Sequence, residues 1–310
     1  MLEFLFVVLG FLLLIKGADF LVDGASSIAK KFGIPEIVIG LTIVSVGTSM
    51  PELFISVTSA LKGYSDMTIG NVVGSNLANL LLILGITAIV KPVLFERETV
   101  KYEIPICLAS TILLYVFANT SNLISRAESG ILLIFFSLFI VYTIVLAKRK
   151  KIKKQKTKSK TSLSKDIILM ILGVLGLKYG GDLTVDNAVK IAELLGLSAK
   201  VISITILAIG TSLPELVTSV SAAKKGESDL AIGNIIGSNI FNVFLIIGVS
   251  SFISPINYSV SYNFDLIYLF FALILLLIFA YTKPKLKMSR TNGIIYFLGY
   301  VVYMIILFII

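Results

Sequence analysis

The chain has 310 residues, of which 57% are apolar, and its 27 Lys and Arg outnumber its 18 Asp and Glu to leave a net charge of +9. This apolar fraction exceeds that of soluble globular domains, so we interpret the chain as a membrane protein with several spans. Because it contains one Cys and no His, intrachain disulfides, histidine-ligated metals and histidine proton relays are excluded.

Apolar runs long enough to cross a bilayer recur along the whole chain. We therefore expect an all-α membrane protein with ten transmembrane helices, at about 3–24, 36–61, 67–90, 102–119, 127–147, 166–188, 199–223, 229–253, 264–282 and 292–310. The first run lacks the basic start of a signal peptide, so it is expected to remain as the first span.

A strongly basic segment separates the fifth predicted helix from the sixth. We interpret residues 148–164 as a solvated cytoplasmic linker, between a first five-helix repeat over 1–147 and a second over 165–310. Binding of the segment to anionic lipid headgroups is the alternative. A cytoplasmic linker places both termini outside the cell, and most Lys and Arg then fall in cytoplasmic loops, as the positive-inside rule requires. The excess of Lys and Arg thus indicates a multi-pass protein of the plasma membrane, and it does not require a nucleic acid partner to explain it.

One stretch of the second span, Gly47-Thr48-Ser49-Met50-Pro51-Glu52, recurs as Gly210-Thr211-Ser212-Leu213-Pro214-Glu215. The surrounding segments 39–79 and 202–242 are identical at more than half of their positions, which indicates an internal duplication. Because each repeat has an odd number of spans, the second copy must enter the membrane from the opposite side. Inverted repeats of this kind are typical of secondary transporters, whose sites lie near the midplane where broken helices meet.

The repeated stretch places a carboxylate within an apolar run. An ionisable side chain at membrane depth is costly unless it faces a partner or a cavity, so Glu52 and Glu215 are candidate functional residues. The proline before each glutamate breaks the helix and frees backbone carbonyls beside the Thr and Ser hydroxyls. Such a set of oxygens suits Ca²⁺ or Na⁺. A proline kink with a structurally paired glutamate is the alternative, but the duplication of the stretch favours a site.

A second motif follows in each copy, Gly70-Asn71-Val72-Val73-Gly74-Ser75-Asn76-Leu77-Ala78-Asn79 and Gly233-Asn234-Ile235-Ile236-Gly237-Ser238-Asn239-Ile240-Phe241-Asn242. Helical spacing places Asn71, Ser75 and Asn79 on one face, and the second copy repeats the pattern. Small residues in the first and sixth helices also predict that these two helices pack closely, at Gly10, Gly17, Gly24, Gly173, Gly176 and Gly180.

These paired G-T-S-x-P-E and G-N-x-x-G-S-N-x-x-N motifs resemble the two α-repeats of the cation/Ca²⁺ exchanger superfamily, and the prokaryotic sodium/calcium exchangers in particular. The resemblance implies that the second, third, seventh and eighth helices hold the ions while the first and sixth slide to switch access. It implies a Ca²⁺ site of Glu52 and Glu215 with backbone carbonyls of Thr48 and Thr211. The Na⁺ sites and the centre would add Ser49, Ser75, Ser212, Ser238, carbonyls near Ser45 and Ala208, and Asn79 and Asn242.

The chain departs from the best-known archaeal and potassium-dependent exchangers at Asn242, where they carry Asp. The centre is therefore expected to hold two carboxylates and two amides. The proton-coupled branch tends to carry G-N-x-x-E, whereas the equivalent positions here are Gly74 and Gly237. Sodium coupling is favoured over proton coupling.

We therefore predict a Na⁺/Ca²⁺ antiporter that works by alternating access, with both ions competing for a midplane site around the two glutamates. Proton- or potassium-coupled Ca²⁺ or cation antiport is the alternative, and a cation channel is less favoured because one chain supplies both halves of the site. The sequence shows no grouping of a nucleophile with a base that would indicate an enzyme, and no cofactor is expected. The expected partners are Ca²⁺, Na⁺ and the lipid bilayer, and the chain is expected to act as a monomer.

Overall fold

The computed structural model describes residues 2–31, 45–149, 162–226, 228–282 and 285–309. The first half of the chain contains α1 (Leu2–Lys31), α3 (Ser45–Thr48), α4 (Met50–Leu61), α5 (Ser65–Leu77), η2 (Ala78–Ile83), α6 (Leu84–Val90), β1 (Val93–Leu94), η3 (Thr99–Glu103), α7 (Ile104–Ser121), β2 (Leu123–Ile124) and α8 (Arg126–Arg149). The second half contains α9 (Leu163–Leu195), α10 (Ala199–Ile202), η4 (Ser203–Leu207), α11 (Ala208–Thr211), α12 (Leu213–Lys225), α13 (Ser228–Phe241), η5 (Asn242–Ile247), α14 (Gly248–Ile253), β3 (Ile256–Asn257), η6 (Val260–Tyr262), α15 (Asn263–Tyr281), β4 (Lys287–Met288) and α16 (Arg290–Ile309).

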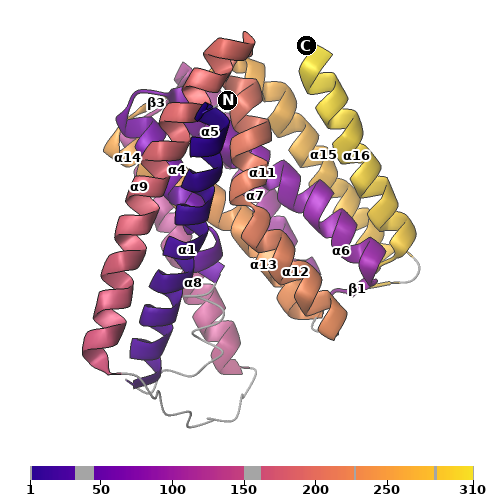
Figure 1. Ribbon diagram of the computed structural model, residues 1–310. Helices are drawn as coiled ribbons and strands as arrows, with labels where there is room; N and C mark the ends of the chain where they lie inside the picture. The colour runs from indigo at the N-terminus through magenta and orange to yellow at the C-terminus, as the bar shows by residue number, and fades with distance from the viewer. Residues whose placement is uncertain (1, 32–44, 150–161, 227, 283–284, 310) are drawn as a thin grey trace.

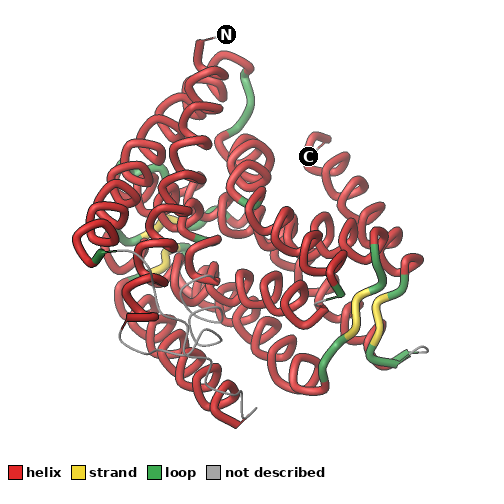
Figure 2. Tube along the Cα trace, turned by 60° about the horizontal axis from the view of Figure 1, so that its bottom comes forward, coloured by secondary structure: helices red, strands yellow, loops and turns green. Residues whose placement is uncertain are grey.

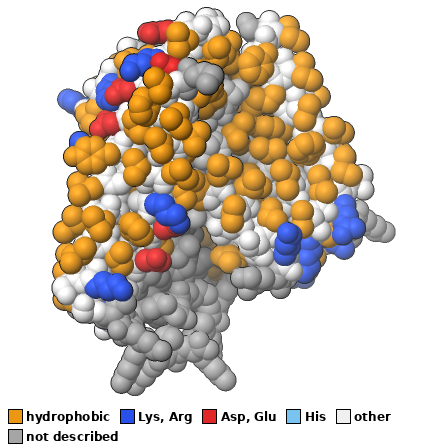
Figure 3. All heavy atoms as spheres, in the orientation of Figure 1, with side chains coloured by type: hydrophobic (Ala, Val, Ile, Leu, Met, Phe, Trp, Pro, Cys, Tyr) orange, Lys and Arg blue, Asp and Glu red, His pale blue; other side chains and the backbone are white. Residues whose placement is uncertain are grey.

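The predicted all-helical membrane protein is confirmed. Within the described ranges, eight helices are long and apolar enough to cross a membrane, and a helix pair bent by 45° between α11 and α12 would make a ninth. The predicted second span, 36–61, lies partly outside the described residues. Its described part contains α3 and the short apolar helix α4. The count of ten therefore stays a prediction. On the face of the molecule that Figure 3 shows, apolar side chains cover most of the surface, as expected of a surface that contacts lipid.

Two spans pass through the middle of the molecule. The span Ser65–Val90, built from α5, η2 and α6, has 83% of its apolar window buried, and Leu230–Ile253, built from α13, η5 and α14, has 78%. The other six have 17–39% buried, so they surround these two. Both central spans contain a π-helical segment, η2 and η5. Such segments are often found at functional sites.

Two short strand pairs join loops that are distant in sequence. β1 pairs with β4 through Val93 and Met288, and β2 pairs with β3 through Leu123 and Asn257. Figure 2 shows the two pairs in separate parts of the molecule. Each pair links a loop of the first half of the chain to a loop of the second half, an arrangement that the apolar pattern did not indicate.

The helices α1 and α9 lie side by side and antiparallel along one edge of the molecule (Figure 1). A Cβ atom added at Gly17 would lie 2.7 Å from the Leu177 backbone nitrogen and 2.8 Å from the Gly173 carbonyl oxygen. A Cβ at Gly180 would lie 2.9 Å from the Gly10 carbonyl. The predicted close contact is confirmed, because only residues without side chains let the two backbones approach this closely.

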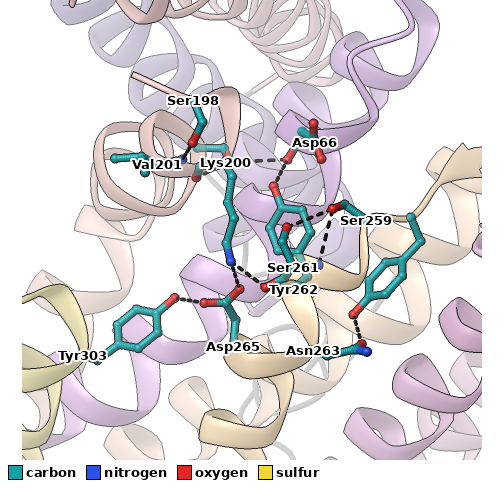
Figure 4. A network of polar contacts seen from close by, with 12 residues as sticks. Asp66, Ser198, Lys200, Val201, Ser259, Ser261, Tyr262, Asn263, Asp265 and Tyr303 are labelled. Atoms are coloured by element: carbon teal, nitrogen blue, oxygen red, sulfur yellow. Dashed lines mark hydrogen bonds and ion pairs between the residues drawn. The ribbon is translucent and has the colours of Figure 1, made fainter. Parts of the chain in front are cut away.

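A buried ion pair anchors the start of the seventh predicted helix to the outer helices (Figure 4). Lys200 Nζ lies 2.6 Å from Asp265 Oδ2, and the Tyr303 hydroxyl donates to Asp265 Oδ1 at 2.7 Å. Lys200 also donates to the Ser261 carbonyl at 2.7 Å. The Asp265 side chain has no exposed surface, whereas that of Lys200 is 19% exposed. The carboxylate therefore depends on its two partners for stabilisation.

Lys200→Met should destabilise the protein by about 3 kcal/mol, because it leaves the Asp265 carboxylate buried without its counter-charge. Thermal unfolding of the purified protein in detergent measures the loss. The matched control is Lys16→Met, since Lys16 pairs with Asp19 at 3.2 Å but is 68% exposed, and exposed pairs contribute little. Equal unfolding midpoints for the two variants would contradict this role of the Lys200 pair.

Candidate ion-binding site

Both copies of the repeated stretch contain the same helix break. Ser49 separates α3 from α4 with φ −90° and ψ 7°, and Ser212 separates α11 from α12 with φ −84° and ψ 6°. Pro51 and Pro214 lie in the first turn of the helix that follows, where a missing backbone N–H costs little. The predicted breaks are confirmed. Each places a glutamate in the first turn of a new helix, at the positive end of its dipole.

The two glutamates are buried and each contacts the other copy of the repeat. Glu52 is 1% exposed and Glu215 is 0% exposed. Ser212 Oγ donates to Glu52 Oε1 at 3.2 Å, and Ser49 Oγ donates to Glu215 Oε1 at 3.3 Å. Ser238 Oγ, from the second motif, also lies 3.3 Å from Glu215 Oε1. The two motifs and the two copies therefore meet at one place.

The threonines beside the breaks contact asparagines of the opposite copy. Thr48 Oγ1 donates to Asn234 Oδ1 at 3.4 Å, and Thr211 Oγ1 lies 3.4 Å from Asn71 Oδ1. Thr211 Oγ1 is also 3.5 Å from Ser75 Oγ. As in the contacts of the serines with the glutamates, each threonine contacts a side chain from the other copy of the repeat.

The backbone positions expected to supply carbonyls begin the short helices before the breaks. Ser45 is the first residue of α3 and Ala208 the first residue of α11. The Ala208 carbonyl accepts hydrogen bonds from the Ser212 backbone nitrogen at 3.1 Å and from Thr211 Oγ1 at 3.2 Å. It is therefore turned toward the break in the second copy.

The amides of Asn79 and Asn242 are held by two further asparagines. Asn79 Nδ2 donates to Asn239 Oδ1 at 3.1 Å, and Asn242 Nδ2 donates to Asn76 Oδ1 at 2.9 Å. All four side chains are at most 1% exposed. Reasoning from the sequence assigned no role to Asn76 or Asn239. The available signal was their identity in the two copies of the motif.

Ser56 and Ser219 were also missed by reasoning from the sequence. Ser56 Oγ accepts from Asn71 Nδ2 at 2.9 Å, and Ser219 Oγ accepts from Asn234 Nδ2 at 3.1 Å. Each serine lies four residues after a glutamate, on the same helix face, and occurs in both copies. They orient the asparagines that contact the two threonines.

Four buried oxygens of the predicted centre accept no hydrogen bond from any described residue. They are Glu52 Oε2, Glu215 Oε2, Asn79 Oδ1 and Asn242 Oδ1. Buried acceptors are normally paired, because an unpaired one loses its hydration without replacement. Elsewhere in the described chain the unpaired buried atoms are hydroxyl oxygens, apart from Asp265 Oδ2, which faces Lys200. Asn79 and Asn242 follow Ser75 and Ser238 by four residues, and Ser238 contacts Glu215. Carboxylate and amide oxygens are ligands that a hard cation accepts.

The charge of this centre comes from two carboxylates alone. In the parts of the chain that the structure describes, no three Asp, Glu, His or Cys side chains are grouped to hold a metal. Any cation bound here must therefore be coordinated mainly by neutral oxygens in addition to Glu52 and Glu215. Large, flexible oxygen shells of this kind suit Ca²⁺ better than Mg²⁺.

Comparison with known proteins identifies the family. The model of the family described as sodium/calcium exchanger protein matches residues 2–145 and 165–309. The chain therefore belongs to the sodium/calcium exchanger family, whose members are transporters and not enzymes. It is 38% identical to a putative antiporter, CaxA, of Alkalimonas amylolytica over 98% of both chains. It is 35% identical to the sodium/calcium exchanger MaX1 of Methanosarcina acetivorans, over 99% of this chain and 98% of that one.

Solved structures agree with this assignment. A structure of the sodium-calcium exchanger NCX_Mj, soaked with Na⁺ and Ca²⁺, is 33% identical and covers 97% of both chains with a TM-score of 0.66. A second structure of the same exchanger, soaked with Na⁺ and Sr²⁺, has a TM-score of 0.69 at 32% identity over 98% of both chains. The predicted superfamily resemblance is confirmed.

Without cations, Glu52→Gln and Glu215→Gln should be at least as stable as the wild type, because each removes a buried charge that lacks a counter-charge. Only the wild type should gain stability on addition of Ca²⁺, by about 2.7 kcal/mol at a hundredfold excess over the dissociation constant. Thermal unfolding in detergent with chelator and with Ca²⁺ checks both statements. An equal Ca²⁺ effect in all three proteins would place the cation elsewhere.

Proposed function

We propose that this protein is a Na⁺/Ca²⁺ antiporter in which the two ions compete for one site built around Glu52 and Glu215. The observation that carries the proposal is the set of buried, unpaired oxygens on two glutamates and two asparagines. The names of the relatives and of the structural neighbours support the choice of ions. The proposed ligands are the side chains of Glu52, Glu215, Ser49, Ser75, Ser212, Ser238, Asn79 and Asn242 and carbonyls at Thr48, Thr211, Ser45 and Ala208.

Competition follows from the charge of the site. Two carboxylates balance one Ca²⁺ or two Na⁺, and simultaneous binding of both ions would leave excess positive charge in a region of low dielectric. Because Ca²⁺ and Na⁺ both accept carboxylate, carbonyl and hydroxyl oxygens, the same groups can serve them in turn.

Alternating access follows from burial and from the packing of α1. With Glu52 and Glu215 almost fully buried, an ion reaches them only if a neighbouring helix moves. The helix α1 packs directly on both breaks, since a Cβ added at Gly47 would overlap Val22 and one added at Gly210 would overlap the Phe11 ring. Movement of α1 together with α9 would therefore uncover or cover the site. The glycine contacts between these helices support their movement as one unit.

The proposed topology has residues 1–147 and 165–310 as inverted repeats joined by a cytoplasmic linker at 148–164. Both termini would lie outside the cell in the plasma membrane. Figure 1 supports an even number of crossings, since both chain ends lie in its upper half while the end of α8 and the start of α9 lie at the bottom. A single chain supplies both copies of every proposed ligand, so a monomer suffices for transport.

Sodium coupling is favoured over proton coupling by the space at Gly74. A Cβ atom added there would lie 2.8 Å from both Ala208 Cβ and Ile204 Cα. An acidic side chain, which the proton-coupled branch tends to carry here, therefore does not fit without displacing the broken helix. At the equivalent Gly237 a Cβ atom would meet no described atom within 4 Å, so in the second copy the support comes only from the lack of a carboxylate in the sequence.

Glu52→Gln and Glu215→Gln should each abolish Ca²⁺ transport, because each removes half of the charge that compensates a divalent ion. The measurement is uptake of radiolabelled Ca²⁺ into proteoliposomes under imposed Na⁺, K⁺ or H⁺ gradients, with Glu193→Gln, at an exposed position of α9, as the control. The Na⁺ gradient alone should drive uptake by the wild type. Near-normal uptake by both site variants would disprove the site, and uptake driven by K⁺ or H⁺ would favour the alternative coupling.

Asn242→Asp should add a second pH dependence to transport or alter its Na⁺ dependence. An amide neither gains nor loses a carboxyl proton, so in the wild type any titration within the centre comes from Glu52 and Glu215 alone. An aspartate adds both a charge and a titrating group beside the ions. Ca²⁺ exchange rates against pH and against Na⁺ concentration test this, and superimposable curves for the two proteins would remove Asn242 from the site.

A further inference from the structure

We infer that Asn76 and Asn239 are positioning residues that turn the side-chain oxygens of Asn242 and Asn79 toward the bound cation. This inference rests on the proposed function and adds two residues to it. An asparagine amide has one oxygen, which can bind a cation, and one NH₂ group, which repels it, on a nearly symmetric head. An amide ligand therefore works only if its neighbours select one of the two orientations.

The selection begins at two backbone carbonyls. Asn76 Nδ2 donates to the Asn239 carbonyl at 3.3 Å, and Asn239 Nδ2 donates to the Asn76 carbonyl at 3.2 Å. A carbonyl oxygen can only accept, so the NH₂ group of each side chain must face it. The Oδ1 atoms of Asn76 and Asn239 are thereby directed to the other side of each amide.

The next step of the chain involves the proposed ligands. Asn76 Oδ1 can only accept, so Asn242 must present its NH₂ group there, and the two atoms lie 2.9 Å apart. Asn239 Oδ1 holds Asn79 Nδ2 in the same way at 3.1 Å. Once both NH₂ groups are engaged, Asn242 Oδ1 and Asn79 Oδ1 point away from them, and these are two of the four unpaired oxygens of the centre.

The reciprocal contact of Asn76 with Asn239, here called the amide clasp, lies where the two central helices meet. Asn76 lies in α5, two residues before the π-helical segment η2, and Asn239 lies in α13, three residues before η5. A backbone carbonyl has two lone pairs, so it can accept from a side chain in addition to any hydrogen bond within its own helix. Each of the two carbonyls can therefore select the orientation of the amide that faces it.

The role assigned to Asn76 depends on the amide at position 242. An aspartate there would present an oxygen in either orientation and would have no NH₂ group to donate. Asn76 Oδ1 would then face a carboxylate oxygen, which is unfavourable. A positioning role therefore predicts that the benefit of Asn76 disappears when position 242 carries Asp, whereas a purely structural clasp between α5 and α13 would be needed in both cases.

The experiment is a double-mutant cycle of Asn76→Leu with Asn242→Asp in proteoliposomes. The readouts are the half-saturating Na⁺ and Ca²⁺ concentrations, the maximal rate, and calorimetric Ca²⁺ binding to the purified protein. Asn76→Leu alone should raise the half-saturating concentrations about tenfold, the effect of roughly one hydrogen bond. In the Asn242→Asp background the same substitution should leave them unchanged or lower them.

The matched control is Asn239→Leu, which releases Asn79 and leaves Asn242 held by Asn76. Its effect should persist in the Asn242→Asp background. If Asn76→Leu does not fold, Asn76→Ala replaces it in the same cycle, because water can fill the space that the smaller side chain leaves.

The outcomes separate this inference from the proposed function. A wild type that binds neither Na⁺ nor Ca²⁺ overturns both. The positioning role alone is overturned if the wild type binds both ions but the Asn76 variants lose the same affinity in both backgrounds. It is also overturned if these variants lose no affinity in either background. Loss of affinity in the chain with its native Asn242, with rescue in the Asn242→Asp background and no rescue of Asn239→Leu, supports it.

Discussion

The burial of two carboxylic acids inside a membrane protein governs the arrangement around them. The side chains of Glu52 and Glu215 lie in a region that water scarcely reaches, where a negative charge is costly without a partner. The protein supplies donors to only one oxygen of each carboxylate, from Ser212 and from Ser49 and Ser238. The second oxygen of each carboxylate accepts no hydrogen bond from a described residue. In the proposed site it binds a cation, and the hydroxyls and amides around the glutamates help to replace the water shell of that cation.

Neither copy of the repeat can build this centre alone. The serine beside each break donates to the glutamate of the other copy, each threonine contacts an asparagine of the other copy, and the amide clasp of Asn76 and Asn239 is reciprocal. Because these contacts run from each copy of the repeat to the other, they couple the two halves of the chain. A movement that separates the two copies would break these contacts, so in the proposed antiporter ion binding and helix arrangement depend on each other.

The outer part of the molecule does not follow the same symmetry. The ion pair of Lys200 and Asp265 is not repeated in the sequence of the first half, where the offset of the repeated motifs places Ile37 and Tyr102. Together with Tyr303, this ion pair holds the start of the broken helix in the second copy to α15 and α16. The two halves thus have similar motifs around the glutamates and different attachments to the surrounding helices.

Features that depend on local chemistry could be predicted from the sequence. Proline after Gly-Thr-Ser predicts a helix break wherever it occurs, a glutamate in an apolar run predicts a site, and repetition of both predicts a paired centre. The close contact of α1 with α9 followed from glycine spacing in the same way. The number of spans does not follow from length alone, because a broken helix divides one possible crossing into short pieces such as α11 and α12. The pairing of the buried oxygens became visible only in the folded chain. The contacts that orient the four asparagines join residues at least 160 positions apart, and backbone carbonyls that periodicity does not reveal set their donor and acceptor directions.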